Sequence, residues 1–260
     1  KWLESEGRLS LMHAATTSLA PANSMRGEWR RFAAFLKRPT LPERAPLPQA
    51  AGLRAVVWLV SLDLLVMAAL LGVAGAVMAA GVSLPETALA GMEIGTGIIL
   101  AVVVIAPLTE EIAFRGWLSG RPGHIFGLLA GALAAMVAGL AAMAFFGAAL
   151  ATAGLVALAA GTLVALAIVY RLRHRNTIGW FRRLFPALFW LSTLGFSLVH
   201  LTNFPADQLA TALPLVLPQF VTGTILGYAR VHYGLWASVL LHMLHNGAII
   251  ALVLAASSAA

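Results

Sequence analysis

Cysteine is absent from the sequence, and charged residues are scarce. Without cysteine the protein has no disulfide, no cysteine nucleophile and no thiolate metal site. Charged residues make up 10% of the 260 positions, whereas they make up about a quarter of a typical soluble domain. Hydrophobic residues make up 60%, so the composition excludes an ordinary soluble domain and indicates a protein embedded in a bilayer. Its chemistry must come from glutamate, aspartate, histidine, serine or asparagine.

Long apolar runs recur from Arg54 to the C-terminus. An α-helix needs about 20 such residues to cross the roughly 30 Å of hydrocarbon in a bilayer, whereas barrel strands are shorter and alternate in polarity. The sequence therefore predicts an all-α, polytopic membrane bundle of about seven transmembrane helices. The expected spans are 54–80, 91–118, 124–146, 149–170, 185–203, 208–229 and 234–256.

Lysine and arginine fall on alternate connectors between these spans. The N-terminal segment and the connectors near residues 121, 171–183 and 230 are basic, and the intervening connectors contain neither residue. Topology thus explains the formal charge of +7, and no nucleic-acid partner is expected. The positive-inside rule predicts a multi-pass protein of the cell membrane, with its N-terminus in the cytoplasm and its C-terminus outside.

The chain is expected to have three parts. Residues 1–53 form a polar cytoplasmic segment, residues 54–256 the transmembrane domain, and residues 257–260 a short tail. Because the chain begins with Lys1, Met25 is the expected natural start, with the preceding residues as an extension or tag.

Part of the polar segment has the pattern of a surface helix. The stretch MRGEWRRFAAFLKR places Trp29, Phe32 and Leu36 on one helical face among basic residues. That pattern suits a helix lying on the cytoplasmic surface of the membrane. A solvated linker is the alternative.

The region from residue 124 to residue 170 is rich in alanine and glycine. Gly127 and Gly131 have the spacing that lets two membrane helices approach closely. No acidic, basic or histidine residue lies between His124 and Arg171. This hairpin is therefore expected to serve packing rather than chemistry.

The second span ends in PLTEEIAFRGWL, where two carboxylates and an arginine interrupt an apolar run. A charge near the bilayer centre costs roughly 2.5–3.5 kcal/mol on insertion scales, so such groups normally face protein or water and mark function. Glu111 and Arg115 are four residues apart and share a helical face, which favours an ion pair. Glu110 points about 100° away, which makes it the candidate general base.

Two further spans carry histidines. His200 ends the stretch GFSLVH, and His242 and Asn246 lie four residues apart in HMLHN. A histidine and an asparagine amide on one helical face can donate hydrogen bonds to a developing oxyanion. The other acids in these spans, Asp63 and Glu93, are expected to form hydrogen bonds between helices.

The depth of these groups sets a constraint on the spans. Counted from the predicted cytoplasmic ends at 1.5 Å per residue, His200 lies deeper than Glu110 and His242. The spans therefore cannot all be straight and perpendicular to the membrane. A start of the fifth span at Pro186 would recover part of the difference. The site is expected near mid-membrane or in the cytoplasmic half.

Three motifs occur in order along the chain. They are EExxxR at Glu110, Glu111 and Arg115, FxxxH at Phe196 and His200, and HxxxN at His242 and Asn246. With them the sequence resembles the CPBP family, which comprises CAAX proteases and bacteriocin-processing enzymes and is also called Abi. It is similar to the type II CAAX prenyl endopeptidases over about residues 25–256.

The resemblance implies an intramembrane endopeptidase of the glutamate type that needs no cofactor. Glu110 and His200 would activate a water molecule for attack on the scissile carbonyl. His242 and Asn246 would stabilise the oxyanion, supported by the Glu111–Arg115 pair. The expected partners are membrane lipids and a membrane-associated peptide or protein substrate, and the chain could also be a subunit of a larger membrane complex.

Three alternatives remain open at this stage. A zinc protease would use Glu110, His200 and His242 as ligands, although no HExxH motif is present. A serine protease would pair Ser197 with His200, which leaves the other motifs unexplained. A non-catalytic membrane subunit, assembly factor or immunity protein would retain the fold without the reaction.

Overall fold

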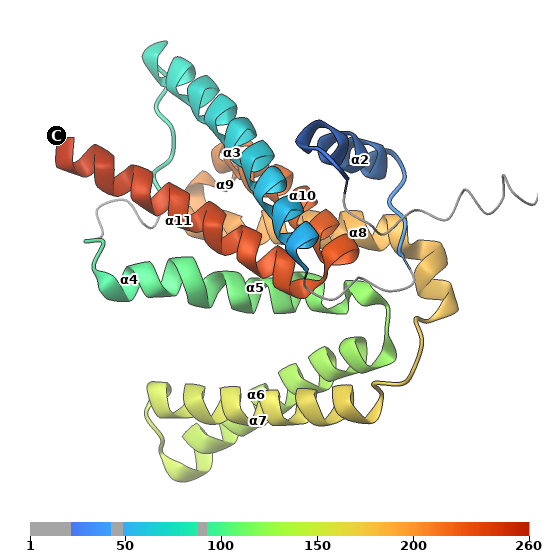
Figure 1. The fold of residues 1–260 in the computed structure, drawn as a ribbon. Coiled ribbons are helices and arrows are strands. Elements are labelled where there is room, and N and C mark those ends of the chain that lie inside the picture. Colours follow the sequence, from blue (N-terminus) through green and yellow to red (C-terminus); the bar gives the residue numbers. More distant parts are fainter. Residues whose placement is uncertain (1–21, 43–48, 88–92, 260) are drawn as a thin grey trace, which may run out of the picture.

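The computed structural model describes residues 22–42, 49–87 and 93–259, and the regular structure in these ranges is helical throughout (Figure 1). Seven helical stretches are long and apolar enough to cross a membrane, which confirms the predicted all-α bundle. The chain is a multi-pass membrane protein with these seven candidate spans. They are Ala50–Ala79, Thr96–Ser119, Pro122–Phe146, Leu150–Arg171, Gly179–Asn203, Ala206–Tyr233 and Leu235–Ala256.

Four of these spans each consist of a single helix, and the other three are composite. The single helices are α3 (Ala50–Ala79), α6 (Pro122–Phe146), α7 (Leu150–Arg171) and α11 (Leu235–Ala259). The second span joins α4 (Thr96–Leu100), the π-helix η1 (Ala101–Ile105), α5 (Ala106–Arg115) and the 3₁₀-helix η2 (Gly116–Ser119). The fifth joins α8 (Gly179–Val199) to η3 (His200–Asn203), and the sixth joins η4 (Ala206–Gln208), α9 (Leu209–Ala212), η5 (Leu213–Val216) and α10 (Leu217–Tyr233).

A proline explains why the second span is not a continuous α-helix. Pro107 stands in the first turn of α5, directly after the π-helix. Proline has no N–H, and its ring clashes with the carbonyl four residues earlier, so helices bend or widen at such a position. The N–H of Ala106 donates to Ala101 O in π-helical register. The corresponding donor for Val102 O would be residue 107, which has none.

The core of the bundle surrounds α10. Its side chains are buried almost continuously from Thr222 to Val231, and α8, α11, α3 and the N-terminal helix pack around it. Phe181, Phe185 and Phe189 line the buried face of α8. Helix α5 enters this core from one side, with Glu111 and Arg115 among its buried residues.

The α6–α7 hairpin stands apart from this core. Its two helices pack mainly on one another, and in Figure 1 they lie on the opposite side of α5 from α2 and α3. A Cβ atom built on Gly131 would lie 2.9 Å from Gly161 O, so the helices touch through backbone. The close approach predicted for Gly127 and Gly131 is confirmed, since both face α7 at short range.

The N-terminal helix predicted from the sequence is present as α2 (Met25–Lys37). Its buried residues are Glu28, Phe32 and Phe35, so the inward face is turned relative to the predicted set of Trp29, Phe32 and Leu36. A buried carboxylate determines which face of α2 points inward. Glu28 is fully buried and accepts hydrogen bonds from the hydroxyls of Tyr228, at 2.7 Å, and Tyr233.

Two local expectations are wrong. The fifth span begins at Gly179 rather than at Pro186, which lies inside α8. Glu93 is exposed ahead of α4 and makes no hydrogen bond between helices within the described part of the chain. The other expected partner, Asp63, is fully buried and does bridge helices.

Candidate active site

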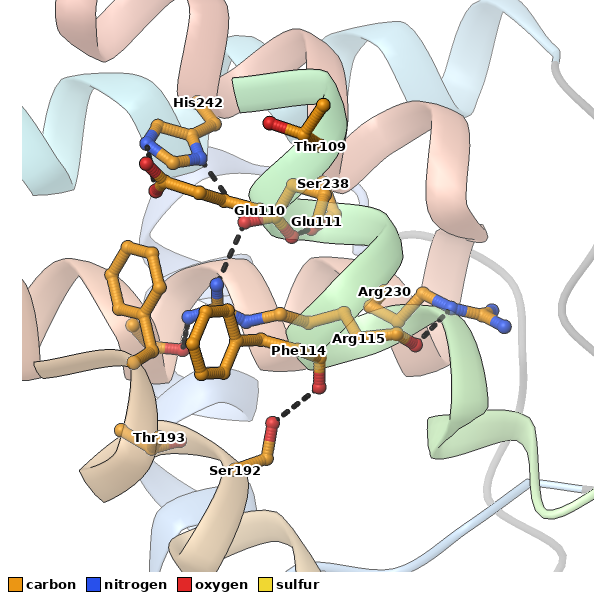
Figure 2. Close-up of polar contacts among 12 residues, drawn as sticks. Thr109, Glu110, Glu111, Phe114, Arg115, Ser192, Thr193, Arg230, Ser238 and His242 are labelled. Carbon is orange, nitrogen blue, oxygen red and sulfur yellow. Dashed lines mark hydrogen bonds and ion pairs between the residues drawn. The ribbon is translucent and has the colours of Figure 1, made fainter. Parts of the chain in front are cut away.

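Three side chains from three different spans converge at one point. Oε2 of Glu110, on α5, lies 3.9 Å from Nε2 of His200 and 3.8 Å from Nε2 of His242. His200 stands where α8 gives way to η3, and His242 lies on α11. The Glu110 side chain is 28% exposed, whereas that of His242 is 4% exposed. Figure 2 shows the Glu110 carboxylate next to the His242 ring.

Glu111 orients His242. Its Oε1 accepts from Nη1 of Arg115 at 2.8 Å and from Nδ1 of His242 at 3.1 Å, and its Oε2 accepts from the Ser238 hydroxyl. Because a carboxylate only accepts, the Nδ1 atom of His242 carries the proton. In the neutral ring, Nε2 therefore presents its lone pair toward Glu110.

A backbone carbonyl fixes the same tautomer in His200, with the proton on Nδ1. Its Nδ1 atom lies 2.7 Å from Phe196 O, which can only accept. Nε2 of the neutral ring is then a hydrogen-bond acceptor that faces Glu110. The Phe196 ring packs against both imidazoles, with centroid distances of 4.7 Å to His200 and 5.7 Å to His242.

Arg115 is fully buried beneath this cluster. Besides its ion pair with Glu111, its guanidinium lies 3.8 Å from the centroid of the Phe196 ring and 3.5 Å from Gly223 O. A Cβ atom on Gly223 would lie 3.2 Å from Nη2 of Arg115, so glycine there lets α10 approach. Nε of Arg230 in turn donates to Arg115 O at 2.9 Å (Figure 2).

Asn246 lies one turn beyond His242 and makes a contact that the sequence did not predict. Its Nδ2 donates to Val102 O at 2.8 Å. Val102 belongs to the π-helix, and its carbonyl is the one left without a π-helical donor by Pro107. One of the two amide N–H groups of Asn246 therefore satisfies the widened turn, and the second is not used by this contact.

A second carboxylate–histidine pair joins His245 of α11 to Asp63 of α3. Nδ1 of His245 is 2.5 Å from Oδ2 of Asp63, and Oδ1 of Asp63 accepts from the Thr222 hydroxyl at 2.8 Å. The pair ties α11 to α3 and α10, as the prediction for Asp63 requires. Thr222 and Ser238 were missed by sequence reasoning, although Ser238 stands one turn before His242 and shares its face.

The contacts of Ser197 do not fit a serine protease. Its hydroxyl donates to Val216 O at 2.8 Å, across the α8–η5 contact, while the Nδ1 atom of His200 is engaged by Phe196 O. The buried hydroxyl is thus a packing contact between two spans.

A zinc ion is the metal that carboxylate and histidine donors of this kind would hold. Zinc takes nitrogen and oxygen ligands at about 2.0–2.2 Å in a tetrahedron. Within the ranges that the structure describes, no group of three or more histidine, aspartate or glutamate side chains is arranged to hold a metal ion. The donor arrangement therefore does not fit zinc, and no step below is routed through a metal.

Comparison with known proteins gives one match. Residues 167–248, from α7 to α11, match the family described as type II CAAX prenyl endopeptidase Rce1-like. This segment is a CAAX protease family domain. It contains Phe196, His200, His242 and Asn246, whereas Glu110 and Glu111 precede it. No curated protein and no solved structure matches the chain.

Proposed function

We propose that the protein is an intramembrane endopeptidase of the glutamate type. The observation that carries this proposal is the convergence of Glu110, His200 and His242 within 4 Å on three candidate membrane spans. Glu110 belongs to a different part of the chain from the family domain that supplies both histidines, and folding brings them together. Ionisable groups that meet inside a membrane bundle normally serve a reaction or a transport path.

In the proposed reaction, Glu110 and His200 share the work of a general base. Their facing atoms both accept hydrogen bonds, so they can bind one water molecule and draw a proton from it. The water oxygen forms a bond to the scissile carbonyl carbon, and the proton passes to Glu110 or His200. When the tetrahedral intermediate breaks its C–N bond, that proton goes to the leaving amine.

His242 and Asn246 are proposed to stabilise the oxyanion. To donate through Nε2, His242 must be protonated on both nitrogens, with Nδ1–H donating to the Glu111 carboxylate. Asn246 has one N–H group beyond the one that binds Val102 O. Donors fixed in this way before the reaction are the most effective, because they need no reorganisation in the transition state.

The proposed substrate is a membrane-associated peptide or protein. The family described as prenyl endopeptidases supplies the first candidate, which is a prenylated C-terminal peptide. Such a substrate would reach the site along the bilayer, where its lipid group is already dissolved.

The test is cleavage by the purified chain in proteoliposomes, with prenylated peptides as substrates. In a parallel experiment, cell membranes that contain wild-type protein or Glu110→Gln would be compared for new peptide N- and C-termini. Glu110→Gln should lower the rate by about 10²-fold or more, since it removes the general base without removing volume. Ser197→Ala is the matched control and should leave turnover intact.

Two outcomes would contradict the proposal. The first is equal product formation by wild-type protein and Glu110→Gln. The second is loss of activity in a chelator together with loss of a stoichiometric bound metal. Unchanged membrane peptides in a correctly folded wild-type protein would instead favour a non-catalytic membrane subunit.

A further inference from the structure

A cavity of about 490 Å³ lies at one end of the bundle, and of the side chains described for the candidate active site its lining includes only Arg230. It forms where the second and sixth candidate spans end and where the third and fifth begin. Arg121, Arg182 and Arg230, from three separate segments, line it together with His124. None of its described lining residues is acidic.

Arg230 is the deepest of these charges. It is 7% exposed, and its Nε and Nη2 atoms donate to the carbonyl oxygens of Arg115 and Gly116 at 2.9 and 3.2 Å. Carbonyl groups satisfy hydrogen bonds, but they do not neutralise a charge. Arg230 forms no ion pair in the described ranges of the chain. The Glu111 carboxylate attracts this charge but is already ion-paired with Arg115, so the buried guanidinium favours a further anion beside it.

The wall of the cavity is fixed in place before any ligand arrives. Gly120 adopts a φ of +64°, and a Cβ atom there would lie 2.5 Å from the Phe181 ring. Its carbonyl accepts from the N–H of Ile178 at 2.9 Å. Nη2 of Arg121 donates to Arg173 O at 3.1 Å. These contacts join the loop before α6 to the loop before α8, so Arg121 and this part of the cavity wall need little ordering on binding.

The position of the cavity favours one class of anion. The ends of four candidate spans meet there, beside the basic connectors at residues 171–183, which places it at the level of the lipid headgroups. Leu118 and Val231 add an apolar side to the polar one. Guanidinium groups match phosphate oxygens in geometry as well as in charge.

We propose that this cavity binds a phosphate group, with Arg121, Arg182 and Arg230 around it. The phosphate of an anionic phospholipid and free inorganic phosphate share the required chemistry. The site is separate from the proposed catalytic centre, so the binding can be measured in the Glu110→Gln background whether or not the chain is a protease.

The test is native mass spectrometry of the full chain in an uncharged detergent, titrated with dioleoyl phosphatidylglycerol. Dioleoylglycerol, which has the same acyl chains and no phosphate, is the lipid control. Arg182→Gln should weaken phosphatidylglycerol binding about tenfold, the usual effect of one charged hydrogen bond. Arg183→Gln removes a neighbouring exposed charge that does not line the cavity and should change affinity by less than about twofold on the same reasoning.

Arg182→Lys keeps the charge and the fold. Its affinity for phosphatidylglycerol should lie between those of Arg182→Gln and Arg183→Gln, because lysine lacks the planar guanidinium that binds two phosphate oxygens at once. Competition by millimolar inorganic phosphate would identify free phosphate as the ligand, and its absence would identify the lipid. Equal effects of Arg182→Gln and Arg183→Gln would overturn the proposal. Equal binding of dioleoylglycerol would also overturn it. So would displacement of phosphatidylglycerol and of inorganic phosphate by a tripeptide with a free C-terminal carboxylate, because the cavity would then bind a peptide carboxylate instead.

Discussion

Two adjacent glutamates have opposite surroundings in this protein. Glu111 is fully buried and accepts from three side chains. Glu110 is partly exposed, and its Oε2 atom has no hydrogen-bond partner within the described residues. The 100° rotation between consecutive helical residues is enough to separate them. One carboxylate is therefore suited to fixing the site and the other to reacting.

Glu111→Gln should destabilise the fold as well as impair activity. The neutral amide would leave the Arg115 guanidinium buried without its ion-pair partner, which costs about 3–5 kcal/mol in comparable cases. Thermal unfolding of the purified protein in detergent would measure the loss. Glu110→Gln is the control and should unfold close to the wild-type temperature, since it loses no direct hydrogen bond. Equal stability of the two variants would contradict the separate roles.

At the scale of an element, the second span shows how a local irregularity is compensated from another helix. The π-helix before Pro107 leaves Val102 O without its π-helical donor, and Asn246 supplies one from α11. The wider turn and the amide together fix the register of α5 against α11. Glu110 lies only a few residues after this turn, so its position depends on the widened turn and on the Asn246 contact.

Asn246→Ala should lower stability by about 1 kcal/mol, the usual scale for a hydrogen bond between membrane helices. Pro107→Ala would restore an N–H within the helix, so the two changes should couple. A double-mutant cycle in thermal unfolding measures this coupling. The double variant is expected to be more stable than the sum of the single effects. Strict additivity would show that the two residues act independently.

At the scale of the molecule, the α6–α7 hairpin is structurally separate from the proposed site. Gly131→Leu should push the two helices apart, since its Cβ would lie 2.9 Å from Gly161 O, and should cost about 1–3 kcal/mol. Activity of the folded fraction should remain near wild type. Gly154→Leu, on the open face of α7 where no atom lies within 4 Å of a built Cβ, is the control for thermal unfolding. A greater loss in Gly154→Leu would contradict this packing.

The orientation of the whole bundle can be measured because the sequence lacks cysteine. Single cysteines at the exposed positions Ser83 and Arg175 would lie on opposite sides of the membrane. The distribution of basic residues predicts that Arg175 faces the cytoplasm. An impermeant maleimide should therefore label Ser83→Cys in intact cells and label Arg175→Cys only after lysis. The reverse pattern would invert the topology.

The sequence by itself determined the spans and the candidate residues. Apolar runs of about 20 residues identify membrane helices because the bilayer has a fixed thickness. The i, i+4 spacing of Glu111 and Arg115 predicted their ion pair because that spacing is set within one helix. The glycine spacing in the hairpin predicted the close approach of its two helices for the same reason, since such approach needs small residues on one helical face.

Only the tertiary structure decided which groups meet. The contacts of Glu110 with His200 and His242, of Asn246 with Val102, and of Glu28 with the tyrosines of α10 all join residues distant in the chain. Single-sequence periodicity gives the face of a residue but not the rotation of one helix against another. That rotation comes from packing across the whole core, and here also from a widened turn at a proline whose consequences appear on another helix.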